Sequence, residues 1–197
     1  MIVAQVYVDD IIFGLTKYEL SHGFLKLMQV EFEMSMIGEL NHFLGLQIHQ
    51  QESGIFISQS KYAKNLVKKF GLESANSVRT PMSPTVKLIS NMLGKNVDFS
   101  LYKSMIGSLL YFTASRPDIS YSVGVCARYQ SNPKESHMIA LKRIIKYVKT
   151  TSDFSVWYSK DTNDVLTGYS DADWDGNADY RKCTSGGCFY VGNNLVS

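Results

Sequence analysis

Short apolar runs alternate along this chain with longer segments that carry apolar residues at helical spacing. The runs at 1–8 and 11–16 flank two aspartates, a pattern typical of a β-hairpin with the aspartates in its turn. Both runs are apolar on successive positions, so we expect this hairpin to lie in a covered sheet. A second hairpin is predicted within 40–59, where Glu-Ser-Gly supplies the turn.

Helices are predicted between and after these hairpins. The predicted segments are 17–34, 58–72, 100–114, 118–130 and 133–150. In the second of them, Ser58 or Ser60 is a candidate N-cap, and Gly71 follows the last turn as a C′ residue would. Asn132 and Pro133 form a favourable N-cap and N1 pair for the last helix.

The rest of the chain reads as loop and strand. Proline and serine are frequent in 73–97, which predicts a linker or a long surface loop. Three short strands are predicted near the end of the chain, at 154–159, 165–172 and 186–192. The expected fold class is therefore α+β.

The composition is compatible with a folded domain but does not indicate a particular binding partner. The 197 residues are 45% hydrophobic and 19% charged, which allows a buried core. The net charge is only +2, but basic residues prevail in 61–103 and 128–149, and acidic residues prevail in 153–179. This asymmetry suggests two functional regions. Three cysteines fit a reducing compartment, and we expect an intracellular protein that is neither secreted nor membrane-spanning.

Adjacent aspartates in a hairpin turn have two explanations. Asp9 and Asp10 could form a solvated turn, because aspartate is a common turn residue. They could instead hold a metal ion, because the bend at a hairpin tip lets neighbouring carboxylates address one ion. Mg²⁺ prefers such oxygen ligands, and two Mg²⁺ ions commonly assist phosphoryl transfer. The two residues alone do not decide between these explanations.

A second acidic group follows a predicted strand. Asp171, Asp173 and Asp175 alternate, so in an extended chain they would line one face. An acidic loop after a strand explains the same pattern. On the predicted helix at 133–150, Lys142, Lys146 and Lys149 share one face, which could track phosphates or could simply be the solvated side of an amphipathic helix.

The order of motifs along the chain resembles one family closely. The sequence YVDDIIFG resembles the catalytic hairpin of reverse transcriptases. The blocks GELNHFLGLQI, GIFISQSKYAKNLVKKFGL, TPM, YKSMIGSLLYFTASRPDISYSVGVCARYQ and GYSDADWDG follow in the order found in the polymerase of copia-type LTR retrotransposons. The resemblance covers essentially the whole chain and implies an RNA-directed DNA polymerase followed by the start of a ribonuclease H domain.

The resemblance assigns roles to residues in the two hairpins. Asp9 and Asp10 match the metal-binding pair of the polymerase, and Tyr7 matches the aromatic residue near the primer end. Residues that match the primer-grip hairpin, which would hold the primer backbone, are Phe43, Leu44 and Gly45. For Phe43 and Leu44, an ordinary place in a strand core is an equally good explanation.

In the acidic region, the resemblance makes Asp171 the first metal ligand of ribonuclease H, with Asp173 as the alternative. It implies a palm and primer-grip or thumb region at 1–72, a linker at 73–97, connection or thumb helices at 98–151, and the first strands of a ribonuclease H-like mixed sheet at 152–197. Arg116, between two predicted helices, is expected to pair with Asp118.

The expected function is two-metal nucleotidyl transfer with Mg²⁺ or Mn²⁺ on an RNA template and DNA primer, without a small-molecule cofactor. Other Pol regions are candidate partners. Because the family places a further palm aspartate upstream and further ribonuclease H ligands downstream, we expect this chain to be a fragment that is inactive alone. Two alternatives stay open: a non-catalytic nucleic-acid-binding remnant, and the functionless product of a degenerate element.

Overall fold

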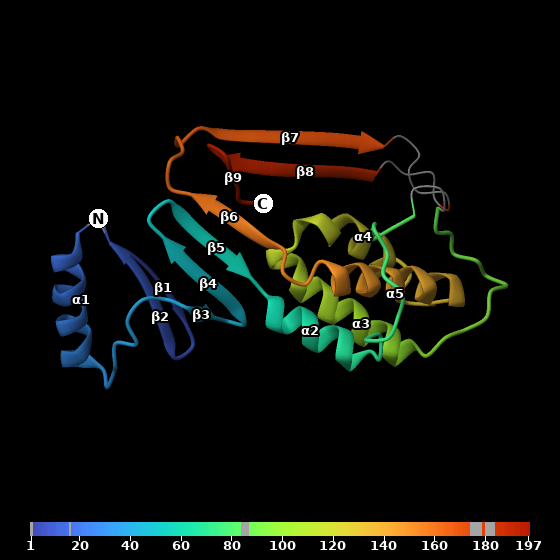
Figure 1. Cartoon of the computed structure of the whole chain (residues 1–197), viewed down its shortest axis with the longest axis horizontal. Helices are drawn as coiled ribbons and strands as arrows, with labels where there is room; N and C mark the ends of the chain where they lie inside the picture. Colours follow the sequence, from blue (N-terminus) through green and yellow to red (C-terminus); the bar gives the residue numbers. More distant parts are fainter. Residues whose placement is uncertain (1, 16, 84–86, 174–178, 180–183) are drawn as a thin grey trace. The chain divides into compact units, whose positions relative to one another are not determined.

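The computed structural model describes residues 2–15, 17–83, 87–173, 179 and 184–197. They form α-helices and antiparallel sheets (Figure 1), so the mixed α and β content expected from the sequence is confirmed. The chain divides into two units, Met1–Asn41 and His42–Ser197. Within the described ranges, the helices are too short or too polar to cross a membrane.

The first unit is a hairpin and a helix. Strands β1 (Ile2–Tyr7) and β2 (Asp10–Leu15) pair antiparallel, with Ile2 opposite Leu15 and Tyr7 opposite Asp10. The turn therefore consists of Val8 and Asp9, and the prediction that Asp9 and Asp10 form it was wrong by one residue. Helix α1 (Tyr18–Glu31) follows, and the ring of Phe24 packs against that of Phe13, with centroids 5.0 Å apart.

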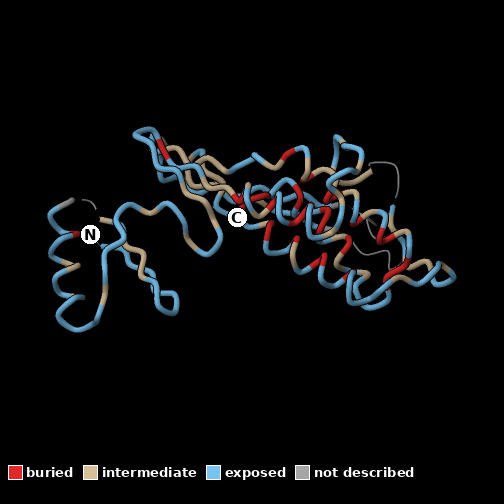
Figure 2. The backbone as a smooth tube through the Cα atoms, turned by 60° about the horizontal axis from the view of Figure 1, so that its bottom comes forward, coloured by how far each residue is buried: buried red, intermediate tan, exposed pale blue. Residues whose placement is uncertain are grey.

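The first unit has almost no buried interior. Every described residue of β1 is exposed, and Ser21 is the only buried residue among those described in this unit. Figure 2 shows the unit almost entirely in the colours of exposed and intermediate residues. Val6 is 66% exposed and Val30 is 80% exposed. The described residues therefore leave this hairpin uncovered.

Helices supply the core of the second unit. Its described α-helices are α2 (Ser60–Lys69), α3 (Phe99–Phe112), α4 (Pro117–Ala127) and α5 (Glu135–Thr150), and the 3-10 helix η1 (Thr113–Ser115) joins α3 to α4. Their apolar faces meet in one buried cluster, which holds most of the red in Figure 2. Leu109, Leu141 and Ile145 are fully buried in it. Cys126 is also buried there, and burial raises the pKa of its thiol to about 12.

The ends of these helices differ in part from the prediction. Gly71 follows α2 with a φ of +65°, as a C′ glycine should. The residue at the N-cap of α2 is Gln59, not Ser58 or Ser60, and it makes no side-chain cap. Helix α5 begins at Glu135, after the predicted Asn132-Pro133 start, because Lys134 is its N-cap and donates its backbone N–H to Nδ1 of His137.

The second unit also contains two antiparallel sheets, one of which has strands both before and after the helices in the sequence. The four-stranded sheet contains β3 (His42–Phe43), β4 (Leu46–Gln51), β5 (Gly54–Ser58) and β6 (Ser155–Ser159) in that order. The three-stranded sheet contains β7 (Leu166–Asp173), β8 (Thr184–Val191) and β9 (Asn194–Leu195). All three predicted C-terminal strands exist. The described pairings are all antiparallel, and β6 pairs with β5 and not with the strands that follow it. Long-range pairing with a strand about 100 residues earlier left no local signal in the sequence.

A buried arginine joins the ends of α4 and α5. Arg116 is 1% exposed and forms a bidentate pair with Asp118, with N–O distances of 2.8 and 2.7 Å, as the sequence predicted. It also donates to the carbonyl and the hydroxyl of Thr151. Its guanidinium lies 5.4 to 5.7 Å from the ring centroids of Phe112, Tyr147 and Phe154. Arg116 therefore fastens the start of α4 to the end of α5.

The polar stretch at 73–97 is anchored to the helices wherever it is described. Arg143 and Lys149 of α5 donate to the carbonyl oxygens of Thr80 and Ala75, at 3.2 and 2.8 Å. Near its end, Lys134 Nζ donates to Oδ1 of Asn96 at 2.6 Å. These contacts hold the stretch along α5, although it contains no regular helix or strand in its described part.

Candidate functional site

The β1–β2 turn combines exposed carboxylates with an unusual backbone. Val8 has a φ of +51°, in the left-handed region, which β-branched residues rarely adopt. A positive φ at only the first turn residue is the pattern of a type II′ turn, where glycine is the usual occupant. Asp9 and Asp10 are both exposed at this tip, and Tyr7 lies opposite Asp10 in the ladder. The turn therefore presents two carboxylates at its end at a cost in backbone energy.

The carboxylates at this tip are the type of ligand that a hard cation binds. Carboxylate oxygens are the ligands that Mg²⁺ and Mn²⁺ prefer, and one or two of them suffice when substrate phosphates complete the shell. In the part of the chain that the structure describes, no three histidine, cysteine, aspartate or glutamate side chains gather closely enough to hold a metal ion. Asp9 and Asp10 are therefore two candidate ligands and do not by themselves form a complete metal site.

A second strained turn closes the β3–β4 hairpin. Phe43 pairs with Leu46, so Leu44 and Gly45 form a two-residue turn with φ values of +48° and +79°. Positive φ at both positions is the type I′ arrangement, which favours asparagine or glycine, and leucine is an unusual first residue. Leu44 is also largely exposed, and Phe43 is half-buried. This turn contains the residues that the sequence predicted to contact a primer.

Tyr111 of α3 holds this second turn in place. Its hydroxyl donates to the carbonyl oxygen of Leu44, and a Cβ built on Gly45 would overlap that hydroxyl. The ring of Tyr111 packs edge-on against Tyr62, with centroids 4.9 Å apart. Only glycine leaves room for this approach, so the turn and the helix fit each other closely.

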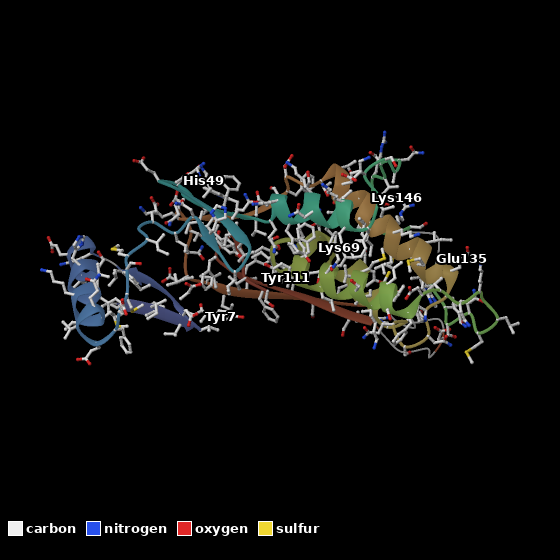
Figure 3. The ribbon with its side chains drawn as sticks, turned by 90° about the horizontal axis from the view of Figure 1, so that it is seen from below. Tyr7, His49, Lys69, Tyr111, Glu135 and Lys146 are labelled. Atoms are coloured by element: carbon white, nitrogen blue, oxygen red, sulfur yellow. The ribbon has the colours of Figure 1, made fainter. Side chains whose placement is uncertain are left out.

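Neighbouring side chains in turn fix Tyr62. Its hydroxyl donates to the carbonyl oxygen of Ser108 at 2.9 Å, and burial raises its pKa. Lys69 donates to the hydroxyl of the same serine at 3.2 Å, and Figure 3 shows Lys69 and Tyr111 on the helical part of this unit. Sequence reasoning missed the role of Tyr111, because its partner lies 67 residues away and an isolated tyrosine gives no sign of it.

The other predicted residues lie outside the two turns. Asp171 is an exposed residue of β7, and its Oδ1 accepts the backbone N–H of Ala172 at 2.9 Å. Asp173 ends β7, but its side chain and the whole of Asp175 lie outside the described residues. Among the described residues, this hydrogen bond of Asp171 is with its own neighbour and not with another predicted site residue.

The three predicted lysines of α5 differ in their surroundings. Lys142 is exposed, and Lys146, labelled in Figure 3, is half-buried. Lys149 donates to the carbonyl oxygen of Ala75, so part of its hydrogen-bonding capacity holds the 73–97 stretch. Lys142 and Lys146 are therefore better placed than Lys149 to meet a ligand.

Sequence reasoning also missed a polar cluster around Asp179. Its carboxylate accepts the backbone N–H of Ser90 at 2.9 Å and the hydroxyl of Tyr129 at 3.2 Å. The backbone hydrogen bond from Ser90 is the main cause that lowers the pKa of Asp179. Tyr129 also stacks on buried His137, with centroids 4.1 Å apart. The cluster links Ser90 of the 73–97 stretch to residue 179, and we assign it a structural role.

Comparisons with known proteins identify the family of the chain. A family profile described as reverse transcriptase (RNA-dependent DNA polymerase) matches residues 1–84. The chain is 35% identical, over 98% of its length, to the retrovirus-related Pol polyprotein from transposon RE1 of Arabidopsis thaliana. It is 31% identical, over its full length, to the corresponding polyprotein from transposon TNT 1-94 of Nicotiana tabacum. An uncharacterized mitochondrial protein of Arabidopsis thaliana is 33% identical over 98% of this chain and 80% of its own length.

The chain belongs to the reverse transcriptase family of copia-type retrotransposon Pol polyproteins. It spans only 13% of the RE1 polyprotein and 15% of the TNT 1-94 polyprotein. No solved structure matches it significantly.

Proposed function

We propose that this chain supplies the metal-binding turn and the primer-holding turn of a polymerase that copies RNA into DNA. The observation that carries the proposal is the β1–β2 tip, where Val8 adopts a disfavoured backbone conformation and Asp9 and Asp10 are exposed. Local strain of this kind costs about 1 to 3 kcal/mol and clusters at functional sites. A merely solvated turn has no need of it.

Asp9 and Asp10 would hold Mg²⁺ or Mn²⁺. A metal bound there would neutralise charge on the phosphates and promote attack by the primer 3′ hydroxyl. The chain's own contribution is to present two carboxylates at a hairpin tip, with Tyr7 opposite Asp10 in the ladder. Placement matters because most of the rate gain in such a reaction comes from correct orientation.

Leu44 and Gly45 would position the primer backbone, together with Phe43. The Tyr111 hydroxyl fixes the Leu44 carbonyl, and the missing side chain at Gly45 allows close approach at the turn. Lys142 and Lys146 would contribute phosphate contacts elsewhere on the second unit. An RNA template with a DNA primer is the expected ligand, and other Pol regions are the expected protein partners.

Asp171 would be one metal ligand of a ribonuclease H site, with Asp173 as the alternative. Its support is its exposed position in an antiparallel strand. We further propose that the isolated chain does not polymerise, since its described residues offer only two clustered carboxylates at the tip.

Metal binding tests the central part of this function. Mn²⁺ titrated into the chain and followed by electron paramagnetic resonance should show weak binding that disappears in Asp9→Asn and in Asp10→Asn. Glu31→Gln, which removes an exposed carboxylate at the end of α1, is the matched control and should leave binding unchanged. Equal binding by all variants would contradict the assignment of Asp9 and Asp10.

Primer extension tests the proposed inactivity. The chain, a DNA primer annealed to an RNA template, nucleotides and Mg²⁺ should give no extension. Incorporation that disappears in Asp9→Asn would contradict the inactivity while supporting the role of Asp9.

A further inference from the structure

We propose that one face of the β4–β5–β6 sheet is a stacking surface for single-stranded nucleic acid. The surface consists of an aromatic row, His49, Phe56 and Trp157, and of the lysines along the outer side of α2. The proposal goes beyond polymerisation, because it needs neither Asp9 nor Asp10.

Strand register places the aromatic row on one face. His49 is opposite Phe56 in the β4–β5 ladder, and Phe56 is opposite Trp157 in the β5–β6 ladder. Residues directly opposite each other in antiparallel strands point to the same side of the sheet. The three side chains therefore form a continuous row across three strands.

The side chain of Trp157 extends over its neighbour strand β5. A Cβ built on Gly54 would lie 2.6 and 2.8 Å from two atoms of the indole ring, so the ring occupies the space above this glycine. The ring centroid of Phe56 is 4.4 Å from that of Trp157, at an interplanar angle of 47°. Trp157 is half-buried, so part of its indole ring is accessible, where a base could stack.

The two faces of this sheet have different surroundings. Val156 and Tyr158 point to the opposite face, and they line a cleft together with residues of η1, α4, β8 and β9. On the face of the aromatic row, His49 is exposed and Phe56 is 36% exposed. Aromatic side chains are thus partly accessible on this face of the sheet.

Positive charge adjoins the aromatic row. Lys61, Lys64 and Lys68 are exposed on α2, spaced so that they share the side opposite its buried residues. The start of α2 touches the row's face directly, because the backbone N–H of Lys61 donates to Oε1 of Gln47 at 3.0 Å. Asp153 pairs with Lys64 at 3.6 Å, but both side chains are largely exposed, which makes the pair weak. Figure 3 shows His49, α2 and Lys146 along one edge of this unit.

Rings beside lysines favour a single strand over other occupants. Every base has a face that can stack, and base stacking on aromatic side chains tolerates any sequence. A duplex hides these faces inside its stack. Three exposed lysines next to the rings match a phosphate backbone better than they match the apolar face of a second protein copy.

Fluorescence of Trp157 provides the direct test. The chain has two tryptophans, so a Trp174→Phe background leaves Trp157 as the sole reporter. A single-stranded oligonucleotide of about 12 nucleotides, of mixed sequence and as RNA or DNA, should quench this emission and bind more tightly than a duplex of equal length. The variants Trp157→Leu and Phe56→Leu are compared with the wild type by fluorescence anisotropy of a labelled oligonucleotide. Each should bind the oligonucleotide about five- to thirtyfold more weakly.

Controls separate stacking from folding and from the proposed polymerase function. Leucine preserves apolar bulk, and thermal unfolding followed by circular dichroism establishes whether each variant is folded. Trp157→Phe should restore most of the affinity. Tyr121→Ala removes an exposed ring from α4 and should bind as the wild type does. Asp9→Asn should also bind normally, so loss of metal binding and loss of strand binding are distinguishable.

Salt dependence tests the lysines. The slope of log K against log[salt] should fall by about 0.7 for each lysine replaced among Lys61→Gln, Lys64→Gln and Lys68→Gln. Unchanged Trp157 emission on binding, or equal affinity in folded Trp157→Leu and wild type, would overturn the proposal. So would dimerisation in analytical ultracentrifugation that Trp157→Leu abolishes while oligonucleotide affinity stays the same, since the row would then bind a second copy.

Discussion

Helices α1 and α5 have similar lengths, 14 and 16 residues, but very different surroundings. Six residues of α5 are buried in a core that it shares with α2, α3 and α4, whereas Ser21 is the only buried residue described in α1. Most helical stability in proteins comes from packing an apolar face and not from intrinsic propensity. The second unit therefore contains the source of its own stability, and the first unit, among its described residues, does not.

This difference bears on the two candidate turns, one in each unit. Tyr111 ties the Leu44-Gly45 turn to a helix whose inner face is buried, so that turn is fixed by the core. The Val8-Asp9 turn belongs to a hairpin whose strand β1 is exposed along its length. We expect the first turn of the chain to be positioned well only when other protein surface covers the hairpin, while the second keeps its geometry without help.

Removing the buried arginine should have the largest effect. Arg116→Ala leaves Asp118 and the Thr151 carbonyl without their partner and opens space among three rings, so it should lower the free energy of unfolding by about 3 to 5 kcal/mol. Urea unfolding followed by circular dichroism at 222 nm measures this. Arg116→Lys, which keeps the charge but loses the bidentate geometry, should recover only part of the loss. Wild-type stability in Arg116→Ala would show that the unit does not depend on this junction.

Two matched alanine substitutions, one in each unit, test whether the two units differ in stability as proposed. Ile145→Ala creates a cavity in the core and should cost about 2 to 5 kcal/mol, because Ile145 is fully buried. Val6→Ala, in the exposed strand β1, should change the free energy of unfolding by less than about 0.5 kcal/mol. Similar losses in both variants would mean that the hairpin is covered in solution.

The second turn offers a test of intermediate size. Gly45→Ala places a methyl group against the Tyr111 hydroxyl at a φ of +79° and should destabilise the turn by about 1 to 3 kcal/mol. Amide hydrogen exchange of β3 and β4 measures the local effect. Tyr111→Phe in the Gly45→Ala background should relieve part of the clash. If the double variant is no better than the single one, the cost comes from the backbone conformation alone.

Val8→Gly should act in the opposite direction. Glycine adopts a φ of +51° without steric cost. This variant should therefore stabilise the β1–β2 hairpin by up to about 1 kcal/mol. Cross-strand NMR contacts between Tyr7 and Asp10 provide the measurement. The matched control is Val6→Gly, in a strand with ordinary backbone angles, which should weaken the same contacts. Weaker pairing in Val8→Gly would contradict the assignment of strain to this turn.

Acid should affect the second unit through Asp118, with the smallest expected effect. Burial acts most strongly on this carboxyl and raises its pKa, but the hydrogen bonds and charge of Arg116, with the Tyr147 hydroxyl, outweigh burial and hold the pKa below its ordinary 3.8. The stabilisation is therefore complete above that value and is lost as the pH falls through the lower pKa of the folded state. Urea unfolding from pH 5 to pH 2 should show this loss in the wild type, and Asp118→Asn should lack this component.

The sequence predicts features that depend on residues close to one another along the chain. Arg116 and Asp118 are two residues apart, and Gly71 needs only the preceding helix, so both were found from local patterns. Asp98 caps α3 by accepting the Leu101 N–H at 3.0 Å, and an aspartate before an apolar run is a local signal of such a cap.

Non-local contacts and strained turns could not be predicted in this way. Strand β6 pairs with β5 across about 100 residues, and nothing in its composition distinguishes that partner from β7. The turn at Val8 was misplaced because propensity places aspartate and not valine at such a position. Local rules fail where a fold imposes an unfavourable conformation, and such places are often functional.

The buried thiol of Cys126 can report how often the core of the second unit opens. With its pKa raised to about 12, it carries almost no thiolate at neutral pH and lies out of reach of reagents in the core. A thiol-specific reagent can modify it only during moments when the helices separate. Its labelling rate therefore counts openings of the second unit, independently of whatever the exposed hairpin at the start of the chain is doing.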